Sequence, residues 1–261
     1  MPRRRLDTLI AERGLVGSRT SAAAAVRAGQ VRVGRGGARA EKPSQLVAED
    51  VELALDEGPR YVSRGGIKLA NAIEALEVDA GGRSCLDVGA STGGFTDCLL
   101  QHGAERVIAL DVAYGQLDWR LREDGRVVVV ERTNARHLRP EDLPWLPDLT
   151  TVDVSFISIE KLIPALVACM APDGELVAMV KPQFELGRGR VGKGGVVRDQ
   201  DARREALASV AESARDHGLH VRGFAPSGLP GPKGNRETFI QCFRRPPEIE
   251  DVEAAVSEVD A

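Results

Sequence analysis

The chain has little of what a secreted, metal-dependent or membrane protein requires. No apolar run approaches the roughly 18 residues of a membrane span. The best candidate, residues 162–171, is short and contains Pro164. The basic N-terminus has no apolar segment behind it and is not a secretory signal. The four cysteines lie far apart without a CxxC pair, and the four histidines form no metal-ligand pattern. We therefore expect a cytoplasmic protein without disulfides, structural zinc or any other bound metal.

Acidic residues slightly outnumber basic ones, but the excess of positive charge is concentrated at one end. The net charge is −4, yet residues 1–40 hold nine arginines against two acids, a balance of +7. Residues 41–57 carry −5, residues 248–261 carry −6, and the long segment 58–247 is neutral. A basic head, residues 1–40, joined to a neutral body, residues 58–247, favours contact with a polyanion at the N-terminus. A solvated arginine-rich surface would give the same balance, so charge alone leaves both interpretations open.

The basic head has the pattern of a small α+β domain. Apolar side chains recur on one side of a predicted helix within residues 5–15, and a second helix begins near Ser18 and ends at Gly29. Segments 30–40 and 50–55 are predicted as short strands. This order resembles the RNA-binding domain first described in ribosomal small-subunit protein four, on the motifs Arg5-Leu6-Asp7, Ser18-Arg19 and Gly29-Gln30-Val31-Arg32-Val33. Such domains contact phosphates and RNA shape. The resemblance implies RNA contacts from Arg4, Arg5 and Arg19.

The body alternates strands and helices. A helical stripe runs through Ile67, Ala70 and Ile73, and further helices are predicted at 96–101, 159–171 and 201–217. Alternation with strands implies a largely parallel, doubly wound α/β sheet. The last two strands are joined by a turn-rich segment, so we expect them to pair antiparallel, as in the Rossmann-like seven-stranded sheet of methyltransferases. The predicted strands are Cys85–Val88, Val107–Leu110, Val127–Val130, Leu149–Val154, Leu176–Val180, Leu219–Phe224 and Thr238–Phe243.

A glycine-rich turn between the first of these strands and the next helix is the strongest local signal. Its sequence is CLDVGASTGGFTDCLL. It is not the dinucleotide motif GxGxxG, because Ser91 stands where the second glycine would be, and no Gly-Lys-Ser/Thr follows as in a P-loop. In a parallel sheet such a turn lies at the ligand-binding edge. The helix N-terminus behind it can face a carboxylate, such as that of S-adenosylmethionine.

Two further polar residues fit the same ligand. Asp111 ends the second strand, where an acidic residue can accept hydrogen bonds from ribose hydroxyls. Asn134 follows the third strand, a position suited to contact with adenine. A tight strand-to-helix turn would explain the glycines alone, but less well their combination with Asp111 and Asn134. The predicted cofactor residues are Asp87, Gly89, Ala90, Ser91, Thr92, Gly93, Gly94, Phe95, Asp111, Val112 and Asn134.

Long motifs now cover nearly the whole chain. They read RYVSRGGIKL, LDVGASTGGFTDCLL, DVAYGQLDWRLR, ERTNAR, DVSFIS, KPQFE and GPKGNRETF. Together with the N-terminal domain, they resemble the TlyA family, 2′-O-methyltransferases of ribosomal RNA cytidines that were also labelled haemolysins. Its catalytic domain is similar to the FtsJ-like RNA ribose methyltransferases, which carry a Lys-Asp-Lys-Glu tetrad. The resemblance places this tetrad on Lys68, Asp153, Lys181 and Glu237. Some members have tryptophan in place of Tyr61, a departure that concerns the linker.

The tetrad positions also make chemical sense. Asp153 and Lys181 each follow a parallel strand at the ligand-binding edge, and an antiparallel last strand would start at that edge with Glu237. Methylation of a ribose 2′-oxygen requires removal of its proton. A lysine takes a proton only in its neutral form, which burial and a second ammonium favour. We assign Lys181 as the base, Lys68 as its electrostatic partner, and the two carboxylates as orienting groups. Each residue taken alone would more commonly be an ordinary surface residue.

A glycine-rich basic loop follows Lys181. It reads FELGRGRVGKGGVVRD, and it is either a flexible connector or a cover over RNA and cofactor. In the second case Arg188, Arg190 and Lys193 meet phosphates. Arg64, beside Lys68, completes the predicted RNA-binding residues.

We expect four segments: an RNA-binding domain at 1–57, a linker at 58–64, a methyltransferase domain at 65–247 and an acidic tail at 248–261. The resemblance implies S-adenosylmethionine-dependent 2′-O-methylation of cytidine in 16S and/or 23S ribosomal RNA within ribosomal subunits, with no DNA or membrane partner. Two alternatives are weighed against it. A membrane-active cytolysin needs an amphipathic or spanning segment, and none is visible. A non-catalytic ribosome-assembly factor would not need the intact tetrad.

Overall fold

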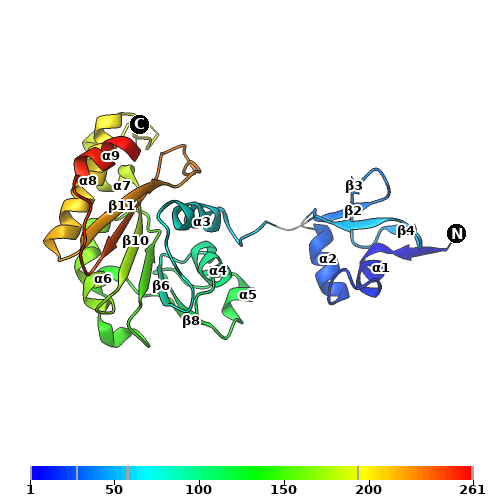
Figure 1. Cartoon of the computed structure of the whole chain (residues 1–261). Coiled ribbons are helices and arrows are strands. Elements are labelled where there is room, and N and C mark those ends of the chain that lie inside the picture. Colours follow the sequence, from blue (N-terminus) through cyan, green and yellow to red (C-terminus); the bar gives the residue numbers. More distant parts are fainter. Residues whose placement is uncertain (1, 28, 57–58, 193, 260–261) are drawn as a thin grey trace. The chain divides into compact units, whose positions relative to one another are not determined.

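The chain forms two compact units, Met1–Arg60 and Tyr61–Ala261 (Figure 1). The computed structural model describes residues 2–27, 29–56, 59–192 and 194–259. The boundary falls inside the expected linker 58–64, because Tyr61 is buried in the core of the second unit. Within the described ranges, the helices fall short of the length and apolar character needed to cross a membrane.

The first unit is a small α+β domain built on one apolar cluster. Helices α1 and α2 pack their buried leucine, isoleucine and alanine side chains against the strands. Strands β1 and β4 pair antiparallel, and a second sheet has the order β3-β2-β5. The sequence pattern did not predict β1 and β4. The elements are β1 (Arg3–Arg5), α1 (Leu6–Glu12), α2 (Arg19–Arg27), β2 (Val31–Val33), β3 (Ala38–Arg39), β4 (Leu46–Ala48) and β5 (Leu53–Leu55).

The second unit is built on a seven-stranded sheet of order β11-β12-β10-β9-β6-β7-β8. Strands β10, β9, β6, β7 and β8 run parallel, whereas β12 is antiparallel to both β10 and β11. The predicted doubly wound sheet with an antiparallel last pair is confirmed. The strands are β6 (Ser84–Val88), β7 (Arg106–Leu110), β8 (Val127–Val130), β9 (Leu149–Val152), β10 (Glu175–Val180), β11 (His220–Pro226) and β12 (Thr238–Phe243).

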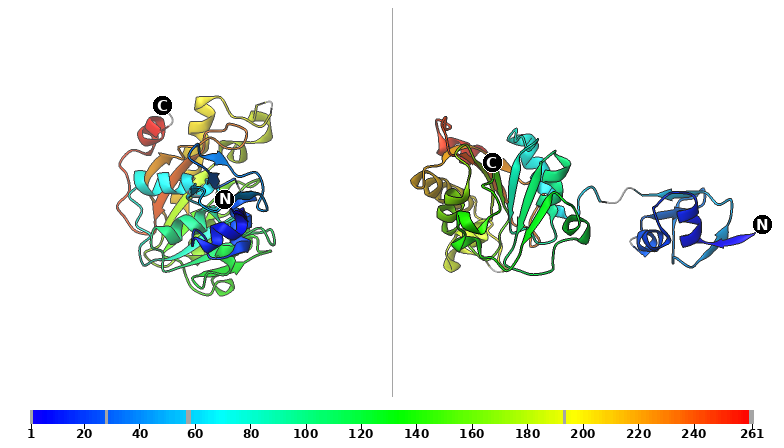
Figure 2. Two further views of the ribbon diagram at one scale, coloured as in Figure 1. Left: turned by 90° about the vertical axis from the view of Figure 1, so that its right-hand side faces the viewer. Right: turned by 90° about the horizontal axis from the view of Figure 1, so that it is seen from below.

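Helices cover both faces of this sheet (Figure 2). Neighbouring strand residues point to opposite faces, so Leu86 joins the core with α6, α8 and α9, whereas Cys85 joins the core with α3, α4 and α5. Helix α9 lies in the expected acidic tail and buries Val252 and Val256. The helices are α3 (Arg64–Ala75), α4 (Gly94–Gln101), α5 (Trp119–Arg122), α6 (Ile163–Cys169), α7 (Pro182–Glu185), α8 (Gln200–Asp216) and α9 (Val252–Val259); 3₁₀ turns are η1 (Ala135–His137), η2 (Pro140–Asp142), η3 (Ile159–Lys161) and η4 (Arg188–Arg190).

Helix α3 confirms only part of the predicted stripe. Ile73 is buried as expected, but Ile67 is exposed, and Leu69 and Ala72 share the buried face with Ile73. The reason is the close approach of α3 to α4: a Cβ on Gly66 would lie 2.8 Å from the carbonyl oxygen of Gly94. This orientation buries Lys68.

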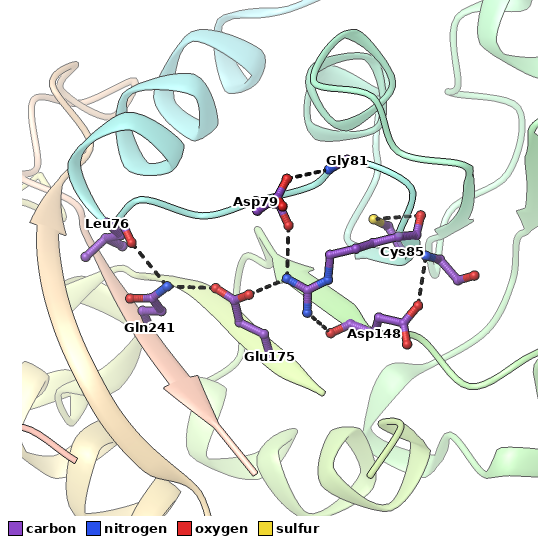
Figure 3. Close-up of polar contacts among 9 residues, drawn as sticks. Leu76, Asp79, Gly81, Cys85, Asp148, Glu175 and Gln241 are labelled. Carbon is purple, nitrogen blue, oxygen red and sulfur yellow. Dashed lines mark hydrogen bonds and ion pairs between the residues drawn. The ribbon is translucent and has the colours of Figure 1, made fainter. Parts of the chain in front are cut away.

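A buried polar network ties together the amino ends of the central strands, opposite the edge where the glycine-rich turn lies (Figure 3). The Arg83 guanidinium pairs with the Glu175 carboxylate and donates to the carbonyl oxygens of Asp148 and Asp79. The Gln241 amide donates to Glu175 at 2.7 Å and to the Leu76 carbonyl oxygen at 3.3 Å. These bonds satisfy a carboxylate that the fold buries almost completely.

Candidate active site

The glycine-rich turn between β6 and α4 depends on glycine for steric reasons. Gly89 has φ +87°, and a Cβ there would lie 2.5 Å from the carbonyl oxygen of Asp153. Gly93 has φ +94°, and a Cβ there would overlap Leu121. The first glycine therefore brings β6 and β9 close together at the ligand-binding edge, and the second lets α5 pack beneath the turn.

Asp87 supports the turn from below. It is fully buried, and its Oδ2 accepts hydrogen bonds from the Thr96 amide at 2.9 Å and the Thr96 hydroxyl at 2.7 Å. Its Oδ1 has no hydrogen-bond partner among the described residues. Burial raises the pKa of this carboxyl to about 7. Asp87 thus anchors α4, and its predicted contact with cofactor stays a prediction.

A cavity of about 490 Å³ opens beside the turn, over the carboxyl ends of β6, β7 and β9. The Asp111 carboxylate lies on its wall and accepts from the backbone amides of Ser91 and Ala113, each at 2.7 Å. Asn134 also lines this cavity and caps η1 by accepting from the Arg136 amide at 3.0 Å. The remaining lining residues are Val88, Gly89, Leu110, Val112, Gln116, Thr133, Ala135, Asp153, Val154, Ser155, Phe156, Ile157 and Leu162.

The cavity fits S-adenosylmethionine. Its volume lies in the range of about 300–1,000 Å³ typical of small-molecule sites. Asp111 would hold the ribose hydroxyls, Asn134 would meet the adenine, and the amides of the glycine-rich turn would meet the carboxylate. A neighbouring cavity, of about 370 Å³, is lined by Gly89, Ala90, Ser91, Thr92, Gly94 and Phe95 among others. In the described part of the chain, only Asp87 and Gly93 of the predicted cofactor residues line neither cavity.

The four tetrad residues meet at another cavity of about 490 Å³. Lys68 comes from α3 and forms an ion pair with Glu237, which directly precedes β12. Lys181 follows β10 and forms a 2.5 Å ion pair with Asp153, which follows β9. Both lysines and Glu237 are buried. Each lysine is thus matched with one carboxylate at the edge where the cofactor cavity lies.

Sheet topology explains this convergence. Parallel strands β9 and β10 end side by side, so the residues after them are neighbours. Strand β12 runs the other way, and its first residue Thr238 pairs with Val180, the last residue of β10. Glu237 therefore lies next to Lys181 in the sheet, although 56 positions separate them in sequence.

Comparison with known proteins supports the same chemistry. A family model described as FtsJ-like methyltransferase matches residues 61–245, and one described as S4 domain matches residues 4–53. The 16S/23S rRNA (cytidine-2′-O)-methyltransferase TlyA of Mycobacterium tuberculosis is 49% identical over 240 residues, which cover 91% of this chain and 89% of that protein. The chain belongs to the TlyA family of FtsJ-like methyltransferases. It is a methyltransferase, and its cofactor is S-adenosylmethionine.

Solved structures agree with this TlyA-family fold. A hemolysin-named protein from Streptococcus thermophilus has a TM-score of 0.75 and 40% identity, covering all of this chain and 95% of that one. An S-adenosylmethionine dependent methyltransferase from Mesorhizobium loti, 15% identical with a TM-score of 0.51, covers 70% of this chain and 100% of that one. This second likeness shows the fold alone.

The N-terminal arginines of this TlyA-family chain are held by acids. Arg4 pairs with Glu12 at 2.6 Å, and Arg5 and Arg19 both pair with Asp7, at 2.7 and 3.3 Å. The Arg5 guanidinium holds the pKa of the buried Asp7 carboxyl well below its usual range. These pairs hold the arginines against two acids of α1, Asp7 and Glu12, and a guanidinium has five N–H donors, more than these pairs use.

The other predicted RNA-binding residues lie on the second unit. Arg64 lines the cavity beside the glycine-rich turn and donates to the Pro230 carbonyl oxygen at 2.9 Å. Arg190 pairs with Glu205 on α8, and Arg188 begins η4. Lys193 lies outside the described residues. Asn235 is buried and links the basic loop to the turn before β12, bonding the Gly195 oxygen at 2.8 Å and the Val197 amide at 2.9 Å.

Sequence reasoning missed several residues that shape the site. The Ser155 hydroxyl accepts from Lys181 at 3.3 Å, and the Asn71 amide holds the turn before β12 by donating to the Ser227 carbonyl oxygen at 3.0 Å. Ser155 could have been found from its place two residues after Asp153 at a strand end. Asn235 gave no usable signal, because an asparagine beside glycine normally indicates only a turn.

Proposed function

We propose that this protein transfers a methyl group from S-adenosylmethionine to the 2′-oxygen of cytidine in 16S and/or 23S ribosomal RNA, within ribosomal subunits. The observation that carries the proposal is the meeting of Lys68, Asp153, Lys181 and Glu237 at one cavity beside the Asp111 cofactor cavity. The relative from M. tuberculosis, whose name states this reaction and both RNAs, supports the choice of nucleotide.

Lys181 is the base in this proposal. Bound cofactor supplies an electrophilic methyl group; the protein must deprotonate and aim the attacking hydroxyl. Lys181 would take that proton, and the Lys68 side chain is the second basic group on the same cavity. Asp153 and Ser155 fix the direction of the Lys181 amine, and Glu237 fixes Lys68. A placed base contributes roughly 10²–10⁴-fold.

The two units divide the work. Residues 1–57 recruit RNA through Arg4, Arg5 and Arg19, and residues 65–247 carry the chemistry. Further phosphate contacts are assigned to Arg64, Arg188, Arg190 and Lys193. Phosphate contacts of this kind orient a protein on RNA without reading its sequence. Ribosomal subunits as substrate place the enzyme in the cytoplasm.

The test uses purified small and large ribosomal subunits that lack cytidine ribose methylation. Full-length protein and cofactor with a labelled methyl group should label one or both subunits, and mapping of ribose methylation should locate the label on cytidine 2′-oxygens. Asp153→Ala serves as the matched inactive protein. Absence of transfer to both subunits, or transfer to a base, would contradict the proposal.

A further inference from the structure

The loop between β9 and η3, residues 153–158, is a wall shared by both large cavities. Asp153, Ser155 and Phe156 line the cofactor cavity and the tetrad cavity alike. Any movement of this loop would therefore displace the Lys181 partners and the cofactor wall together. What holds the loop in place bears directly on catalysis.

Helix α7 holds the loop at both ends. At the near end, Lys181 contacts Asp153 and Ser155. At the far end, both carboxylate oxygens of Glu185 lie 3.2 Å from the Ile159 amide, and the Ser158 hydroxyl lowers the pKa of this carboxyl and so favours its ionised form. Lys181 directly precedes α7 and Glu185 is its last residue, so each end of this short helix contacts the loop.

The middle of the loop needs such support. Phe156 has φ +67° and is 91% exposed. A bulky residue in this left-handed region costs on the order of 1–3 kcal/mol and persists only where its surroundings enforce it. Its ring contacts the Phe184 ring of α7, with centroids 5.3 Å apart. Helix α7 is thus the part of the structure against which the strained segment rests.

We propose that Glu185 is a positioning residue for methyl transfer, which fastens the 153–158 loop to α7 and thereby keeps Lys181 aimed at the substrate hydroxyl. The proposal rests on the proposed function. Burial raises the pKa of the Glu185 carboxyl to about 7, so its ionised form is costly there. An apolar residue in the same place would serve stability at least as well. The hydrogen bonds to the loop give the carboxyl a role that an apolar residue could not fill.

The experiment compares Glu185→Ala, Glu185→Gln and Glu160→Gln in single-turnover and steady-state methylation of ribosomal subunits. Glutamine keeps an acceptor for the Ile159 amide, and Glu160 lies on the same 3₁₀ turn but bonds Ser209 of α8 instead. For Glu185→Ala we expect kcat to fall about tenfold to a hundredfold, because small misplacement of reacting groups is that costly. Its KM for subunits should stay within about twofold, and both glutamine variants should keep kcat within about threefold of wild type.

Each result decides something. If Glu185→Ala lowers only the melting temperature and leaves kcat unchanged, Glu185 is structural and the inference is wrong. If Glu185→Gln loses as much kcat as Glu185→Ala, the inference is also wrong, because glutamine retains the hydrogen-bond acceptor. Should Glu185→Ala fail to fold, Ser158→Ala removes the hydroxyl donor from the other side and should lower kcat about threefold to tenfold; an unchanged kcat there overturns the inference. Inactive wild-type protein would instead refute the proposed function.

Discussion

Lys181 shows at the scale of one residue how catalytic geometry depends on neighbours. Its amine lies between Asp153 and Ser155, on a buried strand end. Lys181→Ala should lower the single-turnover rate of methyl transfer at least about a hundredfold, because a positioned base acts in the transition state. Affinity for subunits, measured by filter binding, should change little. Lys161→Ala, an exposed lysine on η3, is the control. A near-normal rate in Lys181→Ala would reject its role as base.

Asp111 is tested through cofactor binding alone. Its carboxylate accepts two backbone amides, and it faces the cofactor cavity. Asp111→Ala should weaken S-adenosylmethionine binding about tenfold to a hundredfold, the range expected for lost hydrogen bonds to a charged group. Isothermal titration calorimetry measures the change, and binding to subunits should be unaffected. Unchanged calorimetric affinity would argue against a ribose contact.

Glu185 also predicts a pH dependence of stability. Burial raises the pKa of this carboxyl from 4.5 to about 7 in the folded protein, although Ser158 and the Ile159 amide lower it; Glu160 adds to the rise and Lys161 opposes it. The folded state therefore keeps a proton that the unfolded chain loses, so this group stabilises the fold at low pH and loses that contribution as pH rises through 7. Glu185→Gln should match wild type near pH 4.5 and exceed it by up to about 3 kcal/mol at pH 8. Urea unfolding at both pH values checks this; a constant difference would contradict it.

At the scale of elements, the Arg83 network clamps the amino ends of β6, β9 and β10. Arg83→Ala would leave the Glu175 carboxylate buried, with Gln241 as its remaining side-chain partner in the described part of the chain. We expect a loss of roughly 2–4 kcal/mol in the free energy of unfolding, because removing one partner of a buried ion pair leaves the other charge buried and unpaired. Arg126→Ala, which breaks an exposed pair with Asp124, should cost less than about 1 kcal/mol. If chemical denaturation shows the same loss of unfolding free energy for both variants, the network stabilises the fold no more than an exposed ion pair does.

Elements with strong periodicity were predictable from sequence, and those set by close packing were not. All seven strands of the large sheet follow apolar runs bounded by turns, and the reversed direction of β12 follows from the turn-rich segment before it. The start of the α3 stripe was predicted wrongly: Ile73 is buried as expected, but the contact of Gly66 with α4 leaves Ile67 exposed. Strands β1 and β4 have three residues each, too few to show alternation.

Some residues of the candidate site were likewise predictable from the sequence, and others were not. Asp111 and the tetrad stand at strand ends, which topology brings to one edge. Asp87 also belongs to a recognisable motif. It is a residue of β6 and not of the turn, and its carboxylate bonds Thr96 of α4. Glu185 acts through the backbone amide of Ile159, and no pattern of residue types records a hydrogen bond to backbone.

At the scale of the whole molecule, charge and chemistry reside in different units. The net positive charge lies in residues 1–40, whereas the cofactor and tetrad cavities lie wholly within Tyr61–Ala261. Each unit has its own apolar core. A fragment starting at Tyr61 should therefore fold and bind S-adenosylmethionine. It should bind subunits weakly, because phosphate contacts dominate affinity for nucleic acids.

This division is tested by methylation and by salt dependence together. The fragment should fail to methylate intact subunits at concentrations where the full chain is active, while its calorimetric cofactor affinity stays normal. In the full chain, Arg4→Ala with Arg19→Ala should weaken subunit binding and reduce the slope of log affinity against log salt by about 1–2, since each lost phosphate contact removes roughly 0.7–0.9. Arg5 is left in place because it covers the buried Asp7 carboxylate. Arg139→Ala, an exposed arginine of the second unit, should leave the slope unchanged. A fragment that methylates subunits with full-length efficiency at physiological salt would instead place RNA recognition on the second unit, around Arg64 and the loop after Lys181.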